Sequence, residues 1–429
     1  MYVKQTRLRL QIFVFGLFLG MLLPVPAQTQ TLSWKRQLGT SGYDVSYGVA
    51  TDSNGNVYIS GYTDGSVDGA NQGSLDAWVA KYNTSGTLLW KRQLGTSAND
   101  VSYGVATDSN GDVYISGDTD GSIDGSNQGL TDAWVAKYNS SGVLIGKRQL
   151  GTSTNDMSRG VATDSKGNFY ISGFTAGSLG STNQGPWDAW VAKYNSSGTL
   201  VWKRQLGTSV DDVSKGVATD GDGNVYISGF TQGSLAGAFQ GGGLEGTYDA
   251  WVAKYNSSGT LVWKRQLGTS STDTSNGVAT DSSGNVYISG QSYGSLGGSN
   301  QGLGDAWVAK YNSSGTLLWK RQLGTSSQDA SNSVATDSNG NVYMSGFTTD
   351  SLEGANQGSF DAWVAKYNSN GALLWKLKLG TPSPDASNGV ATDRNGNVYM
   401  SGDTAGSLGG DYQGGSQGST DAWVVKYTQ

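Results

Sequence analysis

The chain has 429 residues, of which 66 are glycine and 14 are tryptophan, and its formal net charge is −6. It contains neither cysteine nor histidine, which excludes disulfides, a thiol nucleophile, a histidine base and a Cys/His zinc site. Because a general nucleic-acid binder needs an excess of basic residues, the acidic balance also argues against that class.

The N-terminal segment differs in composition from the rest of the chain. Lys4, Arg7 and Arg9 precede an apolar run over 12–23, and Ala27 ends the short stretch that follows. This order is typical of a signal peptide, so we predict cleavage after Ala27 and a secreted, periplasmic or cell-surface protein. The run is shorter than the ~20 residues of a membrane-spanning helix. The alternative is an uncleaved N-terminal anchor.

Two markers recur along the remainder of the chain. The first is Lys-Arg-Gln-Leu-Gly-Thr, which diverges to Lys-Leu-Lys-Leu-Gly-Thr in its last copy, and the second is Asp-Ala-Trp-Val. Successive copies of the first marker are 56 or 61 residues apart, so the chain consists of seven copies of one unit. The first marker begins at Lys35, Lys91, Lys147, Lys203, Lys264, Lys320 and Lys376, and the second at Asp76, Asp132, Asp188, Asp249, Asp305, Asp361 and Asp421.

Each unit contains four short strand signals and no helical periodicity. In the first unit we predict strands over 48–51, 56–63, 77–82 and 87–94. Asn-Gly and Ser-Gly pairs mark the tight turns after the first and third of these strands. The unit is therefore a four-stranded antiparallel sheet.

Such a sheet is apolar on both faces, since Trp78 and Tyr82 lie on one side of the third strand and Val79 on the other. Copies arranged in a ring bury both faces, so we predict an all-β, seven-bladed β-propeller with the small residues of 48–51 at the axis. The alternative is a linear solenoid, which would need polar terminal repeats.

The two ends of the repeat region are complementary. Residues 31–38 form a fourth strand with no preceding partner, and the chain stops after a third strand at 422–427. We therefore predict that 31–38 complete the blade formed by 385–427, which makes residues 28–429 a single monomeric propeller.

The residues of 55–61 and 76–82 resemble the SBBP group of bacterial β-propeller repeats, a likeness that covers the chain after the signal and implies the fold but no common activity. Ala80, Gly86 and Trp90 are also similar to the tryptophan-docking motif of quinoprotein propellers. That motif has Asp where this chain has Tyr82. The likeness implies that the tryptophans lock blades together and gives no reason to expect a quinone, and no cofactor is predicted.

One aspartate per unit is predicted to lie near the axis, in the loop between an outer strand and the next inner strand. Seven carboxylates around one opening would attract cationic groups, and they are candidate ligand-binding residues. The alternative is that each caps its own turn through backbone hydrogen bonds. These residues are Asp44, Asp100, Asp156, Asp212, Asp273, Asp329 and Asp385.

Two further charged positions recur. The Asp52 position begins Asp-x-Asn-Gly-like turns, which we interpret as Asx turns, with a calcium loop as the weaker alternative. Basic pairs such as Lys35 and Arg36 lie on the outermost strand, where charge discourages edge pairing. The alternative for these pairs is a girdle that binds an anionic surface glycan.

A unique site must come from residues that break the repeat. The loop between second and third strands carries Asn-Gln-Gly in five units, but Phe239 and Tyr412 replace the asparagine in the two units with lengthened loops. We predict that Phe239, Tyr248 and Tyr412 form a ligand rim, with Trp187 as a weaker candidate. Neutral drift in Gly-rich loops is the alternative.

These patterns predict a non-catalytic binding or scaffold propeller whose partner is an extracellular polysaccharide or a protein. Repeated weak sites on one rigid ring would gain by avidity. The alternative is a carbohydrate-active hydrolase or lyase that uses aspartate carboxylates, which normally act as an asymmetric pair. The near-symmetry of the sequence disfavours it.

Overall fold

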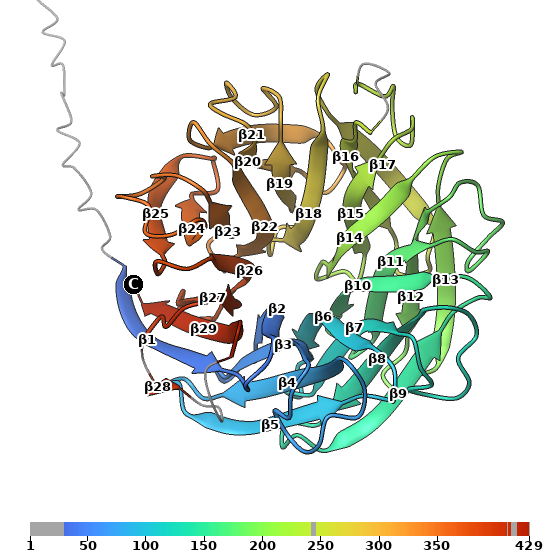
Figure 1. Cartoon of the computed structure of the whole chain (residues 1–429). Helices are drawn as coiled ribbons and strands as arrows, with labels where there is room; N and C mark the ends of the chain where they lie inside the picture. Colours follow the sequence, from blue (N-terminus) through green and yellow to red (C-terminus); the bar gives the residue numbers. More distant parts are fainter. Residues whose placement is uncertain (1–29, 242–245, 410, 413–417, 429) are drawn as a thin grey trace, which may run out of the picture.

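The computed structural model describes residues 30–241, 246–409, 411–412 and 418–428, so the predicted signal peptide lies outside the described residues. Within them, 29 strands form seven sheets around a central axis (Figure 1). The described residues contain no helix long and apolar enough to cross a bilayer.

Six blades each take four consecutive strands, ordered from the axis to the perimeter, and the seventh combines both ends of the chain. The strands are β2 (Asp44–Thr51), β3 (Val57–Thr63), β4 (Asp76–Tyr82) and β5 (Leu88–Leu94) in blade 1; β6 (Asp100–Thr107), β7 (Val113–Thr119), β8 (Asp132–Tyr138) and β9 (Leu144–Leu150) in blade 2; β10 (Asp156–Thr163), β11 (Phe169–Thr175), β12 (Asp188–Tyr194) and β13 (Leu200–Leu206) in blade 3; β14 (Asp212–Thr219), β15 (Val225–Thr231), β16 (Asp249–Tyr255) and β17 (Leu261–Leu267) in blade 4; β18 (Asp273–Thr280), β19 (Val286–Ser292), β20 (Asp305–Tyr311) and β21 (Leu317–Leu323) in blade 5; β22 (Asp329–Thr336), β23 (Val342–Thr348), β24 (Asp361–Tyr367) and β25 (Leu373–Leu379) in blade 6; and β26 (Asp385–Thr392), β27 (Val398–Thr404), β29 (Asp421–Thr428) and β1 (Thr31–Leu38) in blade 7, with β28 (Asp411–Tyr412) beside β1.

The predicted ring closure is confirmed. Strand β1 pairs antiparallel with β29, from Thr31 opposite Thr428 to Leu38 opposite Ala422. The first and last segments of the described chain therefore share one sheet (Figure 1). Trp34 and Leu38 of β1 also pack against Trp78 of blade 1, so β1 covers an apolar surface as well as an edge.

The space between adjacent blades is filled by apolar side chains from both. Between blades 1 and 2, Trp134 of blade 2 packs with Tyr58 and Val79 of blade 1. Both faces of each blade are covered in this way, as the sequence predicts. The tryptophans of the Asp-Ala-Trp-Val marker are at most 1% exposed; they are Trp78, Trp134, Trp190, Trp251, Trp307, Trp363 and Trp423.

A closed circle of hydrogen bonds surrounds the axis at the ends of the inner strands. The hydroxyl of Thr107 donates to the Thr51 carbonyl at 2.9 Å, and the hydroxyl of Thr51 donates to the Thr392 carbonyl at 2.8 Å. The same bond links every adjacent pair of inner strands. Seven identical bonds close only if the ring has seven blades.

The arginines of the outer strands join neighbouring blades. Arg92 Nε donates to the carbonyl of Gly142, in the outer hairpin of blade 2, at 2.7 Å. All six Lys-Arg-Gln-Leu copies make this bond, and Leu377 replaces the arginine in the seventh. These arginines therefore have a structural contact that edge protection alone does not require.

Removal of β1 tests the closure. A chain that begins at Gly39 should aggregate, because it exposes the edge of β29 and an apolar face of blade 1. The matched control begins at Gln30. Light scattering after size exclusion and thermal unfolding would contradict the closure if the shorter chain stayed monomeric with an unchanged melting temperature.

Candidate functional site at the mouth of the axial channel

Each inner strand contains a β-bulge at one residue. In blade 1, Ser46 pairs with Gly61 and Gly48 pairs with Ser60, so Tyr47 is the extra residue. The same shift occurs in all seven inner strands. A bulge re-aims the side chain that it carries. The bulged residues line a central cavity of about 540 Å³, and they are Tyr47, Tyr103, Arg159, Lys215, Asn276, Asn332 and Asn388.

The bulged position is also where the repeat diverges in chemical character. The serine before it recurs in every unit, whereas the bulged residue is Tyr, Arg, Lys or Asn. The repeated motifs of the sequence did not indicate this position as a site. The available signal was this divergence in charge and size within an otherwise repeated strand.

Two cations line one side of the channel. Arg159 pairs with Asp118, and its guanidinium lies 4.0 Å from the ring centroid of Tyr103. Lys215 Nζ lies 5.8 Å from the ring centroid of Phe230, and it forms no ion pair with any described residue. Burial and the neighbouring Arg159 charge lower the pKa of Lys215 to about 8. At neutral pH Lys215 is therefore still a cation, and Asp118, whose charge favours that cation, is already paired with Arg159.

Three asparagines line another part of the wall. Asn332 Nδ2 donates to the carbonyl of Ser387 in the next blade at 3.0 Å, and Asn388 Nδ2 donates to that of Ser46 at 3.1 Å. Asn276 makes the corresponding bond to Ser331. These bonds fix the amides, so the channel wall carries preorganised polar groups.

An aspartate with a raised pKa lies beside this amide wall. Asp403, on β27, accepts a hydrogen bond from Asn388 Nδ2 at 2.7 Å, and burial raises the pKa of its carboxyl to about 6. A second cavity, of about 340 Å³, lies here between blades 6 and 7. Its lining includes Asp403, Asp385, Phe347 and Phe360.

The seven predicted axial aspartates are not exposed to the channel. They begin the inner strands, which are longer than predicted, and are at most 1% exposed. Asp44 Oδ2 accepts bonds from the backbone N and the hydroxyl of Thr40, at 2.6 and 2.9 Å. Its six equivalents do the same. This corrects the expected carboxylate ring, because each aspartate caps its own turn.

The Asp52 position forms the predicted Asx turn. Asp52 Oδ1 accepts bonds from the backbone N of Asn54 and Asn56, both at 2.9 Å. Its other oxygen accepts a bond from the Tyr58 hydroxyl at 3.1 Å. No group of three or more acidic residues among those described is arranged to hold a metal ion.

The three predicted rim aromatics lie in different places. Tyr248 contacts Phe230 edge-on at 4.7 Å between centroids, and Phe230 is the ring beside Lys215. Tyr248 therefore lies against the ring that Lys215 contacts. Trp187 contacts Phe174 in the same manner in blade 3. Among the described residues, Phe239 makes no ring contact with an axial residue.

Tyr412 lies at the perimeter. It belongs to β28, which pairs in parallel with β1, and its backbone lies opposite Gln37 on the outer strand. The backbone of Tyr412 therefore lies at the outer edge of blade 7, and the predicted ligand rim does not bring it together with Tyr248. The lengthened loop carries this residue outward to extend the sheet of blade 7.

Comparison with known proteins agrees with this architecture. The family model of the SBBP beta-propeller repeat matches residues 33–67, 89–124, 201–236, 262–297, 318–353 and 374–409, together half of the chain. The chain belongs to the SBBP family. The family accounts for the propeller scaffold. The residues at the bulged position differ between the repeats of this chain.

Two curated relatives are more distant. An uncharacterized WD repeat-containing protein of Acanthamoeba polyphaga mimivirus is 21% identical over 86% of this chain, and the regulatory protein FlaEY of Caulobacter vibrioides is 24% identical over 48%. The chain spans only 36% and 24% of their respective lengths.

Solved structures share the fold at low identity. The WD40 beta propeller domain of Doa1 aligns over 94% of this chain and 98% of its own, with 10% identity and a TM-score of 0.53. A gluconolactonase from Xanthomonas campestris aligns over 94% of this chain and 98% of its own, with 12% identity and a TM-score of 0.41. The first likeness supports the fold. The TM-score of the second is too low to support an inference.

Asp403 should make stability depend on pH. An aspartate titrates near 3.8 in the unfolded chain and this one near 6 in the folded protein, so the free energy of unfolding falls as pH rises between these values, by about 2–3 kcal/mol. The Asp403→Asn variant has no carboxyl at this position, so its free energy of unfolding should not fall in this way as pH rises. Relative to the native protein, its melting temperature should be unchanged near pH 4 and higher by about 3 °C at pH 8.

The control for this prediction is Asp222→Asn, which gives an exposed turn the residue found in most other units. Thermal unfolding of the three proteins between pH 4 and pH 8 makes the comparison. An Asp403→Asn difference that is the same at both pH values would refute the burial argument.

Proposed function

We propose that this protein is an exported, non-catalytic binding propeller that holds an acidic segment of a partner protein at the mouth of its axial channel. The observation that carries the proposal is Lys215, a cation in the channel wall with no counter-ion within ion-pair distance among the described residues, since the nearby Asp118 pairs with Arg159. A carboxylate from a partner would supply that counter-ion, and a hydrogen bond to a charged group of this kind contributes about 1.5–3 kcal/mol.

The surroundings of Lys215 suit a polypeptide side chain. Arg159, which is paired with Asp118, lies in the same wall, and the fixed asparagine amides provide neutral donors and acceptors across the channel. Trp187 and Tyr248 lie against Phe174 and Phe230, the rings beside Arg159 and Lys215, and aromatic surface of this kind is typical of protein-binding sites. The likeness to WD-repeat propellers favours a protein partner, and the 1–27 segment supports export.

A second candidate is the carbohydrate-active enzyme that uses aspartates. The observation in its favour is the cavity between blades 6 and 7, which places Asp403 and Asp385 in one lining. However, Asp385 makes the same threonine contacts as its six equivalents, so nothing specialises it as a catalytic partner. Hydrolysis of chromogenic glycosides that disappears in Asp403→Asn would favour this candidate.

The binding proposal predicts that a hexaglutamate peptide binds and that Lys215→Gln weakens its affinity about 10-fold or more, as removal of a charged hydrogen-bond partner requires. Titration calorimetry at low ionic strength measures this, since salt screens the attraction. The matched control is Lys203→Gln on the outer strand β13, which should change affinity less than about 2-fold.

Two outcomes would contradict the proposal. Equal weakening by both substitutions would mean that the peptide binds the net charge and not the channel. Binding of a uronic-acid oligosaccharide with the same number of carboxylates, in the absence of peptide binding, would assign the partner to the polysaccharide class.

A further inference from the structure

One position of the outer strands is tryptophan in six blades and glycine in the remaining one. The glycine is Gly146, on β9 of blade 2, and a Cβ built on it would meet no atom within 4 Å. The space that a side chain would occupy is therefore open. The six tryptophans are Trp34, Trp90, Trp202, Trp263, Trp319 and Trp375.

In five of the other blades the indole docks on the outer hairpin of the next blade. Trp90 lies between Tyr58 and Tyr138, with ring centroids 5.9 and 6.5 Å away. Its Nε1 donates to the Ser140 carbonyl at 3.1 Å, and the Arg92 guanidinium lies 5.7 Å from its ring centroid. Four other indoles make the same bond, those of Trp34, Trp202, Trp263 and Trp319.

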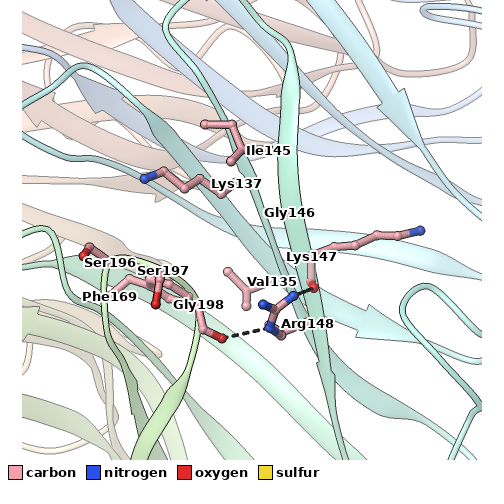
Figure 2. Close-up of a pocket in the computed structure, with 10 residues that line it drawn as sticks. All are labelled: Val135, Lys137, Ile145, Gly146, Lys147, Arg148, Phe169, Ser196, Ser197 and Gly198. Carbon is pink, nitrogen blue, oxygen red and sulfur yellow. Dashed lines mark hydrogen bonds between the residues drawn. The ribbon is translucent and has the colours of Figure 1, made fainter.

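At Gly146 the arginine and the hairpin of the next blade line a surface pocket of about 150 Å³ (Figure 2). The two tyrosines equivalent to those beside Trp90 contact Phe169 instead. A cavity of about this size with apolar walls can hold a benzene ring. Arg148 Nε still donates to the Gly198 carbonyl at 2.8 Å, as its equivalents do, but no tryptophan lies beneath its guanidinium. A guest ring there would gain a cation–π contact.

The hydrogen-bond acceptor of the pocket is also free of its usual partners. In blade 1 the Ser140 carbonyl receives bonds from both Trp90 and Lys81. The equivalent carbonyl, that of Ser196, receives neither from the described residues, because Lys137 pairs instead with Asp112 at 2.9 Å.

Phe169 forms part of the pocket wall. The other six units have valine at this position, whereas Phe169 stacks on Tyr194 at 5.0 Å and contacts Tyr114 at 4.9 Å. Its ring replaces part of the missing indole and is 3% exposed. The remaining space therefore has an aromatic wall, a guanidinium and a carbonyl acceptor.

We propose that this pocket binds a tryptophan side chain of a partner protein, in the part of the internal indoles' position that Phe169 leaves open. The sister blades indicate the ligand, since the equivalent hairpin, arginine and carbonyl hold an indole in five of them. The pocket is on the perimeter, so the proposal is independent of the axial site.

The test uses 5-fluoroindole as a probe, observed by fluorine NMR, on the full chain. The native protein should bind it with a Kd on the order of 1 mM, as expected for a ligand of this size. Phe169→Val should strengthen binding several-fold, because it enlarges the pocket to the form of the sister blades. The double variant Gly146→Trp with Phe169→Val restores the sister arrangement and should abolish binding while keeping the fold.

A further variant tests whether the probe binds to the space left by a missing indole and not elsewhere on the protein. Trp202→Gly in the double-variant background should create an equivalent pocket beside Val225 and restore binding. The proposal is overturned if the native protein shows no saturable binding up to 10-fold above that Kd, or if the double variant binds the probe equally. It is also overturned if the native protein is a dimer that the double variant converts to a monomer, because a second copy would then be the occupant.

Discussion

The structure depends on one constraint, that every blade is apolar on both faces. A sheet of this kind is stable only between two others, and a linear stack always leaves two outer faces in water. The ring removes both, provided that its last sheet is complete. Strand β1 completes it by pairing with β29 and by placing Trp34 and Leu38 against blade 1. The circle of threonine bonds at the axis follows from the same closure.

This constraint also determines where the sequence can vary. The residues between blades are packed by copies of themselves, so a change in one blade has to fit its neighbour. Side chains that face the axial channel are not packed in this way, and the bulged position carries Tyr, Arg, Lys and Asn in different blades. The asymmetric chemistry of the protein is therefore concentrated on its symmetry axis, where every blade contributes one residue.

The exception at Gly146 illustrates the same packing rule. Loss of the indole in blade 2 is accompanied by a gain of aromatic volume in blade 3, where Phe169 replaces the usual valine. The two changes lie in adjacent blades, because each interface is built from both. The compensation is partial, and the difference in volume remains as a pocket that opens to solvent.

The sequence by itself determined the fold. The number of repeats predicts the number of blades, and the unpaired strands at 31–38 and 422–427 predict how the ring closes. Strand β1 begins and ends where its residues predicted, and the Asp52 turns follow from local chemistry. The site was decided by tertiary structure. Alternation along a strand cannot show that a bulge turns Lys215 into the channel, since a bulge is defined by the register with the neighbouring strand. Likewise, Asp44 is buried by the threonines packed around it, and Tyr412 is carried to the perimeter by pairing with β1.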